Sequence, residues 1–499
     1  MGARVRTVFL AALAGFFGVA AGWALALPVN GTYDEAAHVL RAYGSASGQI
    51  YAVDGIQRVP RGLLPADVDC TWVRRLPADC QLPVRRDGTV RDAYSSAAAY
   101  SPLYYLPVGV PVLVSPGTAG IVAGRLVSAL LSALALAAAV ALAYALGNRL
   151  LLAALLLVTT PMVANLAGAV NPNGLEISAG VLLWTCLLGL LRADPAPPPR
   201  LRYALVVAGT AAGAVLATLR YLGPVLLGLS LLAAAGMARP GRVAELLRRR
   251  EVRRAGLVQA AALVVAAGWF VSARAGQLVL DPARATRHGL AGSLRTIVAA
   301  RFSFHVDQLV GRFSYGETPL PSWLVAGWYA LVAALVAPAA LLAGRRACGA
   351  LLAGCVALLV GLDLYFVGRT GWVAQGRYVL PAAAGLVLAP AFVTGWSRAL
   401  GGAGVRRLVR VVALATPPLQ LWALATVLTR FTAGPGAMVN PLHGYRGGGW
   451  LPPGGPVPAL LVEVAGLTTL GIVAWRSVRP AGGPRPEAEH CSTVLSPTH

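Results

Sequence analysis

The sequence predicts an all-α protein that crosses a membrane many times. Of its 499 residues, 57% are hydrophobic, and the mean hydropathy is +0.67. Soluble domains are only about 45–50% apolar. Apolar runs of about twenty residues, each long enough to cross a bilayer as a helix, recur from one end of the chain to the other. We therefore expect one transmembrane domain over residues 1–478, with about twelve helices, and a disordered cytoplasmic tail over 479–499.

The first span is expected at 7–27. Ala24-Leu25-Ala26 resembles a signal cleavage site, but the apolar core is longer than that of a usual signal peptide, so we interpret it as an uncleaved anchor. Residues 102–114 contain three prolines and are interpreted as a half-buried interfacial helix, not a span. The other spans are predicted at 121–146, 150–169, 174–191, 202–219, 222–236, 255–273, 322–343, 348–367, 378–395, 411–428 and 457–475.

The net charge of +23 comes from arginine, since the chain has no lysine. Such a charge would indicate nucleic-acid binding in a soluble protein. Here the arginines fall in alternate loops, as the positive-inside rule requires, so we expect no nucleic-acid partner. The rule places both termini in the cytoplasm. The expected outer loops are 28–120, 170–173, 274–321, 368–377 and 429–456.

The first outer loop, 28–120, is the longest polar stretch and should carry juxtamembrane helices. Cys70 and Cys80 lie ten residues apart within it. A disulfide persists on the oxidising side of a membrane, so we predict that these cysteines are paired. The loop at 429–456 is rich in glycine and proline and is predicted to be mobile.

Four ionisable residues open the first outer loop: Asp34, Glu35, His38 and Arg41. In a helix, Asp34, His38 and Arg41 follow i, i+4, i+7 spacing and share one face. This pattern indicates a site at the membrane surface. An alternative is purely structural, with Thr32 and Glu35 forming a capping box and Asp34 stabilised by the helix dipole.

More polar residues gather at the predicted outer ends of later spans, where they could line one cavity. Ionisable groups at membrane depth are costly and indicate function by default. As alternatives, single arginines could snorkel to lipid headgroups, and Asn173 could only cap a helix. The residues are Arg125, Asn171, Asn173, Glu176, Arg220, Tyr221, Gln375, Arg377 and Tyr378.

Two further interpretations concern polar residues elsewhere. Asp363 and Glu463 lie in or near apolar runs, and interhelical hydrogen bonding is the simplest interpretation of both. His305 and Asp307 are predicted to be solvated loop residues.

This combination of residue types suits transfer from a phosphate-linked donor. A carboxylate can take the proton of an acceptor hydroxyl as general base. Arginine forks, here Arg125, Arg220 and Arg377, match the oxygens of a phosphate leaving group. A second acid, Glu35 or Glu176, could orient the acceptor or hold a divalent metal, Mg²⁺ or Mn²⁺.

Four short motifs in this order resemble those of the GT-C glycosyltransferases and of a bacterial multi-spanning family known only as a domain of unknown function. The resemblance extends from the first span to about residue 395. The motifs are Asp34-Glu35-x-x-His38-x-x-Arg41, Ser101-Pro102-Leu103-Tyr104-Tyr105, Gly124-Arg125-Leu126 and Gln375-Gly376-Arg377-Tyr378-x-x-Pro381.

The resemblance implies a transferase that uses a polyprenyl-phosphate sugar on the outer face of the bacterial cytoplasmic membrane. The acceptor would be a cell-envelope glycan or glycolipid, and inversion is the expected outcome. Asp34 would be the base, with Glu35 and His38 beside it. Asparagines stand at 171 and 173, where some relatives have aspartate, so a metal site is in doubt unless Glu176 compensates. Expected donor-phosphate ligands are Arg41, Arg125, Arg220, Tyr221, Gln375, Arg377 and Tyr378; expected acceptor or metal ligands are Glu35, Asn171, Asn173 and Glu176.

Two other functions fit a chain of this class. A transporter or flippase of lipid-linked sugars would place its site at the bilayer midplane between repeated halves, whereas the polar residues here gather on one side and no repeat is evident. A non-catalytic membrane scaffold would use the first loop to bind a partner.

Overall fold

The chain is mainly helical, as predicted. The computed structural model describes residues 2–83, 88–273, 290–342, 345–370, 374–447 and 449–478. Among these residues, nine helices are long and apolar enough to cross a membrane, and a tenth crossing results if one bent pair counts as a single span. The nine are α1 (Ala3–Ala26), α5 (Thr118–Ala145), α8 (Pro172–Arg192), α9 (Pro199–Leu219), α12 (Arg250–Ser272), α15 (Ser322–Leu342), α16 (Arg345–Thr370), α18 (Thr394–Ala433) and α20 (Pro456–Ser477).

The predicted count of twelve spans is not confirmed, because three of the expected spans are short or broken. Predicted span 150–169 is the pair α6 (Arg149–Val158) and α7 (Pro161–Ala167), bent by 69°. Thr160 caps α7 and Pro161 opens it, so the chain stops one helix and starts another there. Predicted span 222–236 is the 14-residue α10 (Gly223–Gly236).

The third short segment replaces the predicted span 378–395. It consists of η4 (Gly376–Val379), α17 (Leu380–Leu388) and η5 (Ala389–Phe392). An α-helix rises about 1.5 Å per residue, so neither this segment nor α10 matches a hydrocarbon core of about 30 Å.

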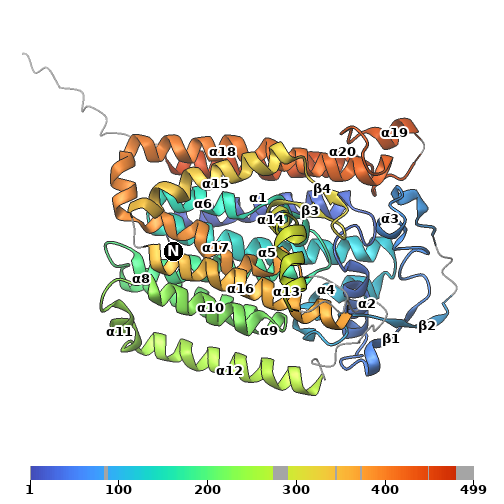
Figure 1. Cartoon of the computed structure of the whole chain (residues 1–499), viewed down its shortest axis with the longest axis horizontal. Coiled ribbons are helices and arrows are strands. Elements are labelled where there is room, and N and C mark those ends of the chain that lie inside the picture. The colour runs from blue at the N-terminus through green and yellow to red at the C-terminus, as the bar shows by residue number, and fades with distance from the viewer. Residues whose placement is uncertain are drawn as a thin grey trace, which may run out of the picture.

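The long helices lie side by side, and the elements of the first outer loop gather at one end of them (Figure 1). At that end, on the right of the figure, lie α2 (Glu35–Ala46), α3 (Cys70–Val73), the strands β1 (Ile56–Pro60) and β2 (Val90–Tyr94), and α19 (His443–Gly447). The N-terminus and α11 (Arg242–Leu247) lie toward the other end. This arrangement agrees with the charge pattern, which placed the first loop and the N-terminus on opposite sides.

Small residues allow α1 to pack closely against α20. Gly15, Gly18 and Gly22 of α1 face α20. A Cβ atom at Gly466 of α20 would lie only 2.6 Å from the carbonyl oxygen of Gly15 and from the backbone nitrogen of Val19. The two backbones therefore touch, as small residues permit in membrane helices.

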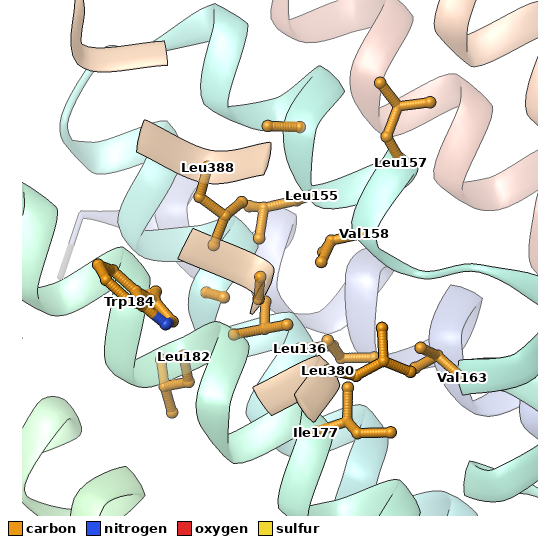
Figure 2. Close-up of a cluster of buried hydrophobic side chains, with 14 of the residues drawn as sticks. Leu136, Leu155, Leu157, Val158, Val163, Ile177, Leu182, Trp184, Leu380 and Leu388 are labelled. Atoms are coloured by element: carbon orange, nitrogen blue, oxygen red, sulfur yellow. The ribbon is translucent and has the colours of Figure 1, made fainter. Parts of the chain in front are cut away.

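A buried apolar cluster joins the short helices to the long ones (Figure 2). Its side chains come from α5, α6, α7, α8 and α17, so the broken span and the short η4–α17 segment are packed in the interior. The labelled members are Leu136, Leu155, Leu157, Val158, Val163, Ile177, Leu182, Trp184, Leu380 and Leu388.

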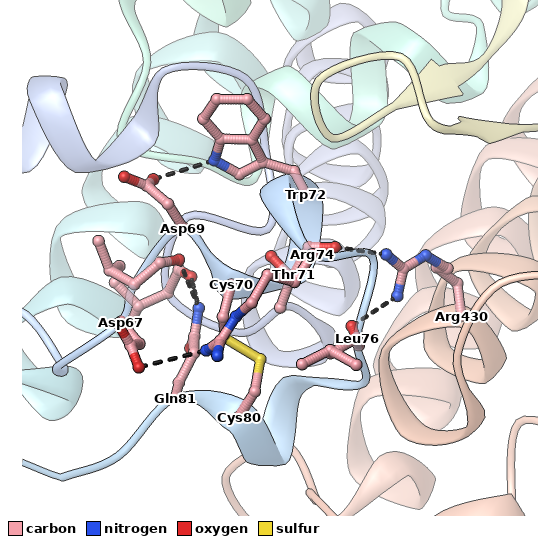
Figure 3. Close-up of a disulfide and its surroundings, with 12 residues drawn as sticks. Asp67, Asp69, Cys70, Thr71, Trp72, Arg74, Leu76, Cys80, Gln81 and Arg430 are labelled. Atoms are coloured by element: carbon pink, nitrogen blue, oxygen red, sulfur yellow. Dashed lines mark hydrogen bonds and ion pairs between the residues drawn. A yellow bond between two sulfur atoms is a disulfide. The ribbon is translucent and has the colours of Figure 1, made fainter.

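The predicted disulfide between Cys70 and Cys80 is confirmed, with the two Cα atoms 6.2 Å apart. It closes α3 onto η2 (Ala78–Cys80) (Figure 3). Arg430 of α18 donates to the carbonyl oxygens of Thr71 (2.6 Å) and Leu76 (3.0 Å), so this loop is fastened to the helical bundle. Strands β1 and β2 pair antiparallel, from Ile56 opposite Tyr94 to Pro60 opposite Val90, and a three-residue 3₁₀ turn, η1 (Val53–Gly55), precedes β1.

The predicted helix at 102–114 forms, and one predicted loop contains more structure than expected. The segment 102–114 is helix α4 (Pro102–Val114), which packs on α2 and α5; its interfacial position stays a prediction. The described part of the loop 274–321 holds α13 (Leu290–Thr296), η3 (Ile297–Arg301), α14 (Phe302–Val310) and the paired strands β3 (Arg312–Phe313) and β4 (Thr318–Pro319). The predicted disordered tail, 479–499, lies outside the described residues.

The contact between α1 and α20 should make Gly466 intolerant of even one methyl group. We expect Gly466→Ala to lower the thermal unfolding midpoint in detergent, by an amount equivalent to about 1–3 kcal/mol, because the helices must separate. Gly471→Ala on the same helix is the control, since its Cβ would lie 3.7 Å from the nearest atom, the carbonyl oxygen of Ala413. Equal midpoints for the two variants would contradict the close packing.

Candidate functional site

Asp34 stands at the start of α2 in an unusual backbone conformation. Its φ of 58° and ψ of 11° lie in the left-handed region, which is uncommon for residues other than glycine and clusters at functional sites. The side chain does not cap the helix. Its Oδ2 atom lies 3.2 Å from Nη2 of Arg377, and 42% of the side chain is exposed. The carboxylate therefore faces a buried cation on one side and open space on the other.

The capping box proposed as the structural alternative does not form. Thr32 instead donates from Oγ1 to Oδ1 of Asn165 (2.9 Å). The N–H of Ala36 is capped by Oδ1 of Asn30 (3.0 Å), which lies outside the expected motif. Asp34 is thus free of the capping role.

Arg377 is the second residue of the short helix η4 (Gly376–Val379), and its side chain has contacts on several sides. It is 1% exposed. Its guanidinium donates from Nε to Oδ1 of Asn173 (3.2 Å) and from Nη1 to Oε1 of Gln375 (3.1 Å). Its Cζ atom lies 3.8 Å from the centroid of the Tyr33 ring, a cation–π contact that fixes the plane of the guanidinium.

A second arginine is linked to the first through α8. Arg220 follows the end of α9 and pairs with Oε2 of Glu176 at 3.0 Å. The same oxygen accepts from Nδ2 of Asn173 (2.8 Å), so Asn173 bridges Glu176 and Arg377. Arg220 also lies 4.8 Å from the ring centroid of Tyr378. The structure therefore brings together Asp34, Arg377, Asn173, Glu176 and Arg220 in one connected group.

His38 lies beside this group on α2. Its Nδ1 is 2.8 Å from the hydroxyl of Tyr105, and its ring stacks on those of Tyr100 and Tyr105 with centroids 6.0 Å apart. Burial, reinforced by the positive charges of Arg220 and Arg377, holds the pKa of His38 well below its usual range. His38 is therefore neutral.

Glu35 and Arg125 form a separate pair that is completely buried. The pair is bidentate, with Nε–Oε1 at 2.7 Å and Nη2–Oε2 at 2.6 Å, and the two side chains are 0% and 1% exposed. Arg125 gives its remaining N–H groups to the carbonyl oxygens of Ala24, Leu27 and Pro28.

Glu35 also accepts from two backbone N–H groups, those of Asn30 (3.0 Å) and Val170 (3.1 Å). All five donors of Arg125 and both oxygens of Glu35 are thus used within the protein. The pair fastens α1, α5 and the turn at Val170, between α7 and α8, to the start of α2.

Two more of the predicted ligands also bond within the protein. Arg41 donates from Nε and Nη2 to the carbonyl oxygen of Tyr100 and from Nη1 to those of Gln49 and Ile50. Asn171 caps α8, accepting from the N–H of Asn173 (3.0 Å), and its Nδ2 donates to the carbonyl of Tyr33 (2.8 Å). These bonds order the loop and the turn around the site.

The phenol ring of Tyr221 packs against Tyr100 at 4.9 Å and Phe270 at 5.6 Å. Its hydroxyl is buried and has no hydrogen-bond partner among the described residues.

Several site residues were not predicted. Tyr33 lies under Arg377, and its hydroxyl donates to the carbonyl of Arg312 (2.9 Å) and accepts from Nε2 of Gln308 (2.7 Å). In the sequence, only its position next to Asp34 could have indicated that Tyr33 belongs to the site. Gln308 comes from α14, within a stretch interpreted as loop, so no sequence pattern could have indicated it.

An aromatic and acidic rim lies beside the start of α2. Tyr315 stacks on Trp72 with centroids 4.2 Å apart and donates to Oδ1 of Asn30 (3.3 Å). Oδ1 of Asp69 accepts from Nε1 of Trp72 (2.9 Å), as Figure 3 shows. The same oxygen accepts from Nδ2 of Asn30 (2.8 Å). The disulfide loop thereby reaches the start of α2.

The described residues do not fit a metal site. They contain no group of three or more His, Cys, Asp or Glu side chains that could hold a metal ion. Glu35 and Glu176, the expected acidic ligands, are each bound to a different arginine.

Comparison with known proteins identifies a family. Residues 17–386 match the family described as "Predicted membrane protein (DUF2142)". No curated protein sequence matches the chain.

Two crystal structures of ArnT from Cupriavidus metallidurans, one bound to undecaprenyl phosphate and one in the apo state, resemble the fold with TM-scores of 0.43 and 0.41 and 16% sequence identity. The alignments cover 96% and 92% of this chain, and 77% and 74% of ArnT.

The buried pair should be a structural requirement. Glu35→Ala leaves the Arg125 charge buried and unpaired, so we expect a loss of about 3–5 kcal/mol, seen as low yield or a strongly reduced unfolding midpoint. Asp67→Ala is the control, because Asp67 is 62% exposed in its pair with Arg74 and such pairs contribute about 0–1 kcal/mol. Similar effects of the two variants would refute the structural role.

The neutral state of His38 should make stability depend on pH. The unfolded chain protonates His38 near pH 6.5, whereas the folded protein does so only at lower pH. The unfolded state then binds more protons, so this contribution is complete above about pH 6.5 and is lost as the pH falls. His38→Gln, which keeps a partner for Tyr105, should flatten the unfolding midpoint measured from about pH 8 to pH 5. Parallel curves for variant and wild type would refute this.

Proposed function

The chain belongs to the DUF2142 family of predicted membrane proteins, and from its site we propose that it is a membrane glycosyltransferase. It would move a sugar from a polyprenyl-phosphate donor to a hydroxyl of a cell-envelope glycan or glycolipid. One observation carries the proposal: a half-exposed carboxylate, Asp34, lies directly against a buried arginine, Arg377, that is linked to a second arginine.

The donor phosphate would bind at Arg377 and Arg220. Among the described residues, Arg377 uses three of its five N–H groups, which leaves one on each terminal nitrogen for phosphate oxygens. A guanidinium fork matches phosphate geometry, and stacking on Tyr33 keeps the fork in one plane. Arg220, over Tyr378, supplies a second positive charge.

Asp34 would act as the general base. As the acceptor oxygen attacks the anomeric carbon, its proton passes to the Asp34 carboxylate. The bond between that carbon and the phosphate oxygen breaks, and the phosphate leaves with the electron pair, stabilised by the two arginines. A bound phosphate would also compete with Asp34 for Arg377, and so release the carboxylate toward the acceptor.

The acceptor would approach across the rim formed by Tyr315 and Trp72. These stacked rings are linked through Asn30 to the start of α2, where Asp34 lies, and aromatic surfaces suit the apolar faces of sugar rings. Asp69, which accepts from Trp72 and Asn30, would supply an acidic edge for sugar hydroxyls.

The outer face of the bacterial cytoplasmic membrane is the proposed place of reaction. The site lies at the end of the bundle where the first loop gathers, away from the N-terminus and α11 (Figure 1). The stretch 239–254, which includes α11 and is rich in arginine, indicates the cytoplasmic side by the positive-inside rule. A transporter would need its site between repeated halves at mid-membrane, and neither it nor a scaffold is favoured by a particular contact here.

Asp34→Asn should abolish transfer while leaving the fold intact. We expect the rate to fall by about 10²–10⁴-fold, because asparagine cannot take the acceptor proton. The assay uses purified protein in lipid nanodiscs, a panel of labelled polyprenyl-phosphate sugars and envelope glycolipid extract, and measures label moved to the acceptor. Asp67→Asn, another exposed acid of the first loop, is the matched control and should keep full activity. Wild-type transfer by Asp34→Asn would remove the base assignment.

A further inference from the structure

Two polar residues without a role so far lie buried beneath the segment that carries Arg377. Asp363 of α16 is 0% exposed, and its Oδ2 lies 2.8 Å from Nε2 of His305. Its Oδ1 accepts from the backbone N–H of Ala374 at 2.7 Å, and Nη1 of Arg301 lies 3.5 Å from the same oxygen. His305, expected in a solvated loop, is instead a buried residue of α14.

The backbone of α14 touches the same segment at Gly376. A Cβ atom at Gly376 would lie 2.2 Å from the carbonyl oxygen of His305, so no larger residue fits there without moving the chain. The N–H of Gly376 donates to Oε1 of Gln308 at 2.6 Å. The segment is therefore held at Ala374 by Asp363 and at Gly376 by Gln308.

Gln308 also connects this backbone to the aromatic base of the site. Its Nε2 donates to Oε1 of Gln375 and to the hydroxyl of Tyr33 (2.7 Å). Tyr33 is the ring on which Arg377 stacks, and Gln375 is a hydrogen-bond partner of the guanidinium. One side chain thus sets both the start of η4 and the surface beneath Arg377.

We infer that Asp363, His305 and Gln308 are positioning residues that hold Arg377 opposite Asp34. Asp363 fixes the backbone that precedes Arg377 and, through His305, fixes α14. The inference rests on the proposed function only where activity is measured, since the geometry of Arg377 can be tested on its own. A simple anchor between helices, the alternative expected from the sequence, would stabilise the fold without controlling Arg377.

The first test measures access to Arg377 by phenylglyoxal, a reagent that modifies arginine, with mass spectrometry of the modified peptide. In the wild type, Arg377 is 1% exposed and should react slowly. Asp363→Ala should speed its modification about tenfold or more, since a local opening loses a buried hydrogen bond to a charged group. Asp363→Asn keeps an oxygen for Ala374 and should show a smaller increase. Arg74, which is 53% exposed, is the internal reference and should be unchanged.

Glu463→Ala is the matched control. Glu463 is also a fully buried acid on a spanning helix, α20, and its two oxygens have no hydrogen-bond partner among the described residues. Its loss should leave the Arg377 reaction rate at the wild-type value. If Asp363→Ala does not fold, as judged by size-exclusion chromatography, Gln308→Ala tests the same cradle at Gly376. Folded variants with wild-type reactivity at Arg377 would overturn the inference.

Transfer kinetics then separate positioning from stability. Asp363→Ala should raise the KM for the polyprenyl-phosphate donor and lower kcat, while the KM for the acceptor stays unchanged, because only Arg377 is displaced. If the wild type itself shows no transfer, the proposed function fails and the modification rates still decide the inference. If the wild type is active and Asp363→Ala changes neither donor KM nor Arg377 reactivity, the inference fails alone.

Discussion

The bidentate pair of Glu35 and Arg125 is the interaction on which the rest of the site depends. The guanidinium binds the carbonyl oxygens of Ala24, Leu27 and Pro28, which the end of α1 leaves without helical partners. The carboxylate binds the N–H of Val170, ahead of α8. Since a buried charge without its partner is strongly destabilising, these segments are fixed together. These contacts hold the start of α2 in one position, and they thereby fix the backbone of Asp34.

Neighbouring carboxylates therefore have opposite environments. Glu35 is fully buried and bonded at both oxygens, whereas Asp34, one residue before it, is turned outward by its left-handed backbone. Glu35 is anchored by Arg125, whereas the carboxylate of Asp34 is partly exposed and contacts Arg377. The strain of that backbone conformation is tolerated because the surrounding contacts determine it. Two adjacent acids of similar chemistry thus differ in their surroundings: one is locked in the interior, and the other is partly exposed.

The sequence was sufficient for features that depend on the membrane boundary or on short spacing. The disulfide of Cys70 with Cys80 follows from the short spacing of two cysteines on the oxidising side of the membrane. The grouping of Asp34 with Arg377 follows because polar residues at the same ends of spans must meet. The sequence was insufficient where the burial of a side chain decides its role. Arg125 and Arg377 are the same residue type at similar positions, and only packing separates an anchor from a site residue. His305 was misplaced because α14 forms through contacts with distant residues, such as Asp363.

The three predicted spans that are short or broken all adjoin the site. The bent pair α6 and α7 leads into the turn before α8, the helix that carries Asn173, α10 follows Arg220, and η4 carries Arg377. A helix of 14 residues rises about 21 Å, so at least one of its ends lies within a hydrocarbon core of about 30 Å. Irregular backbone at that depth is tolerated only where protein or a polar cavity surrounds it. The carboxylates, amides and aromatic rings around Arg377 and Arg220 supply that environment, which is why interrupted helices and buried arginines occur together here.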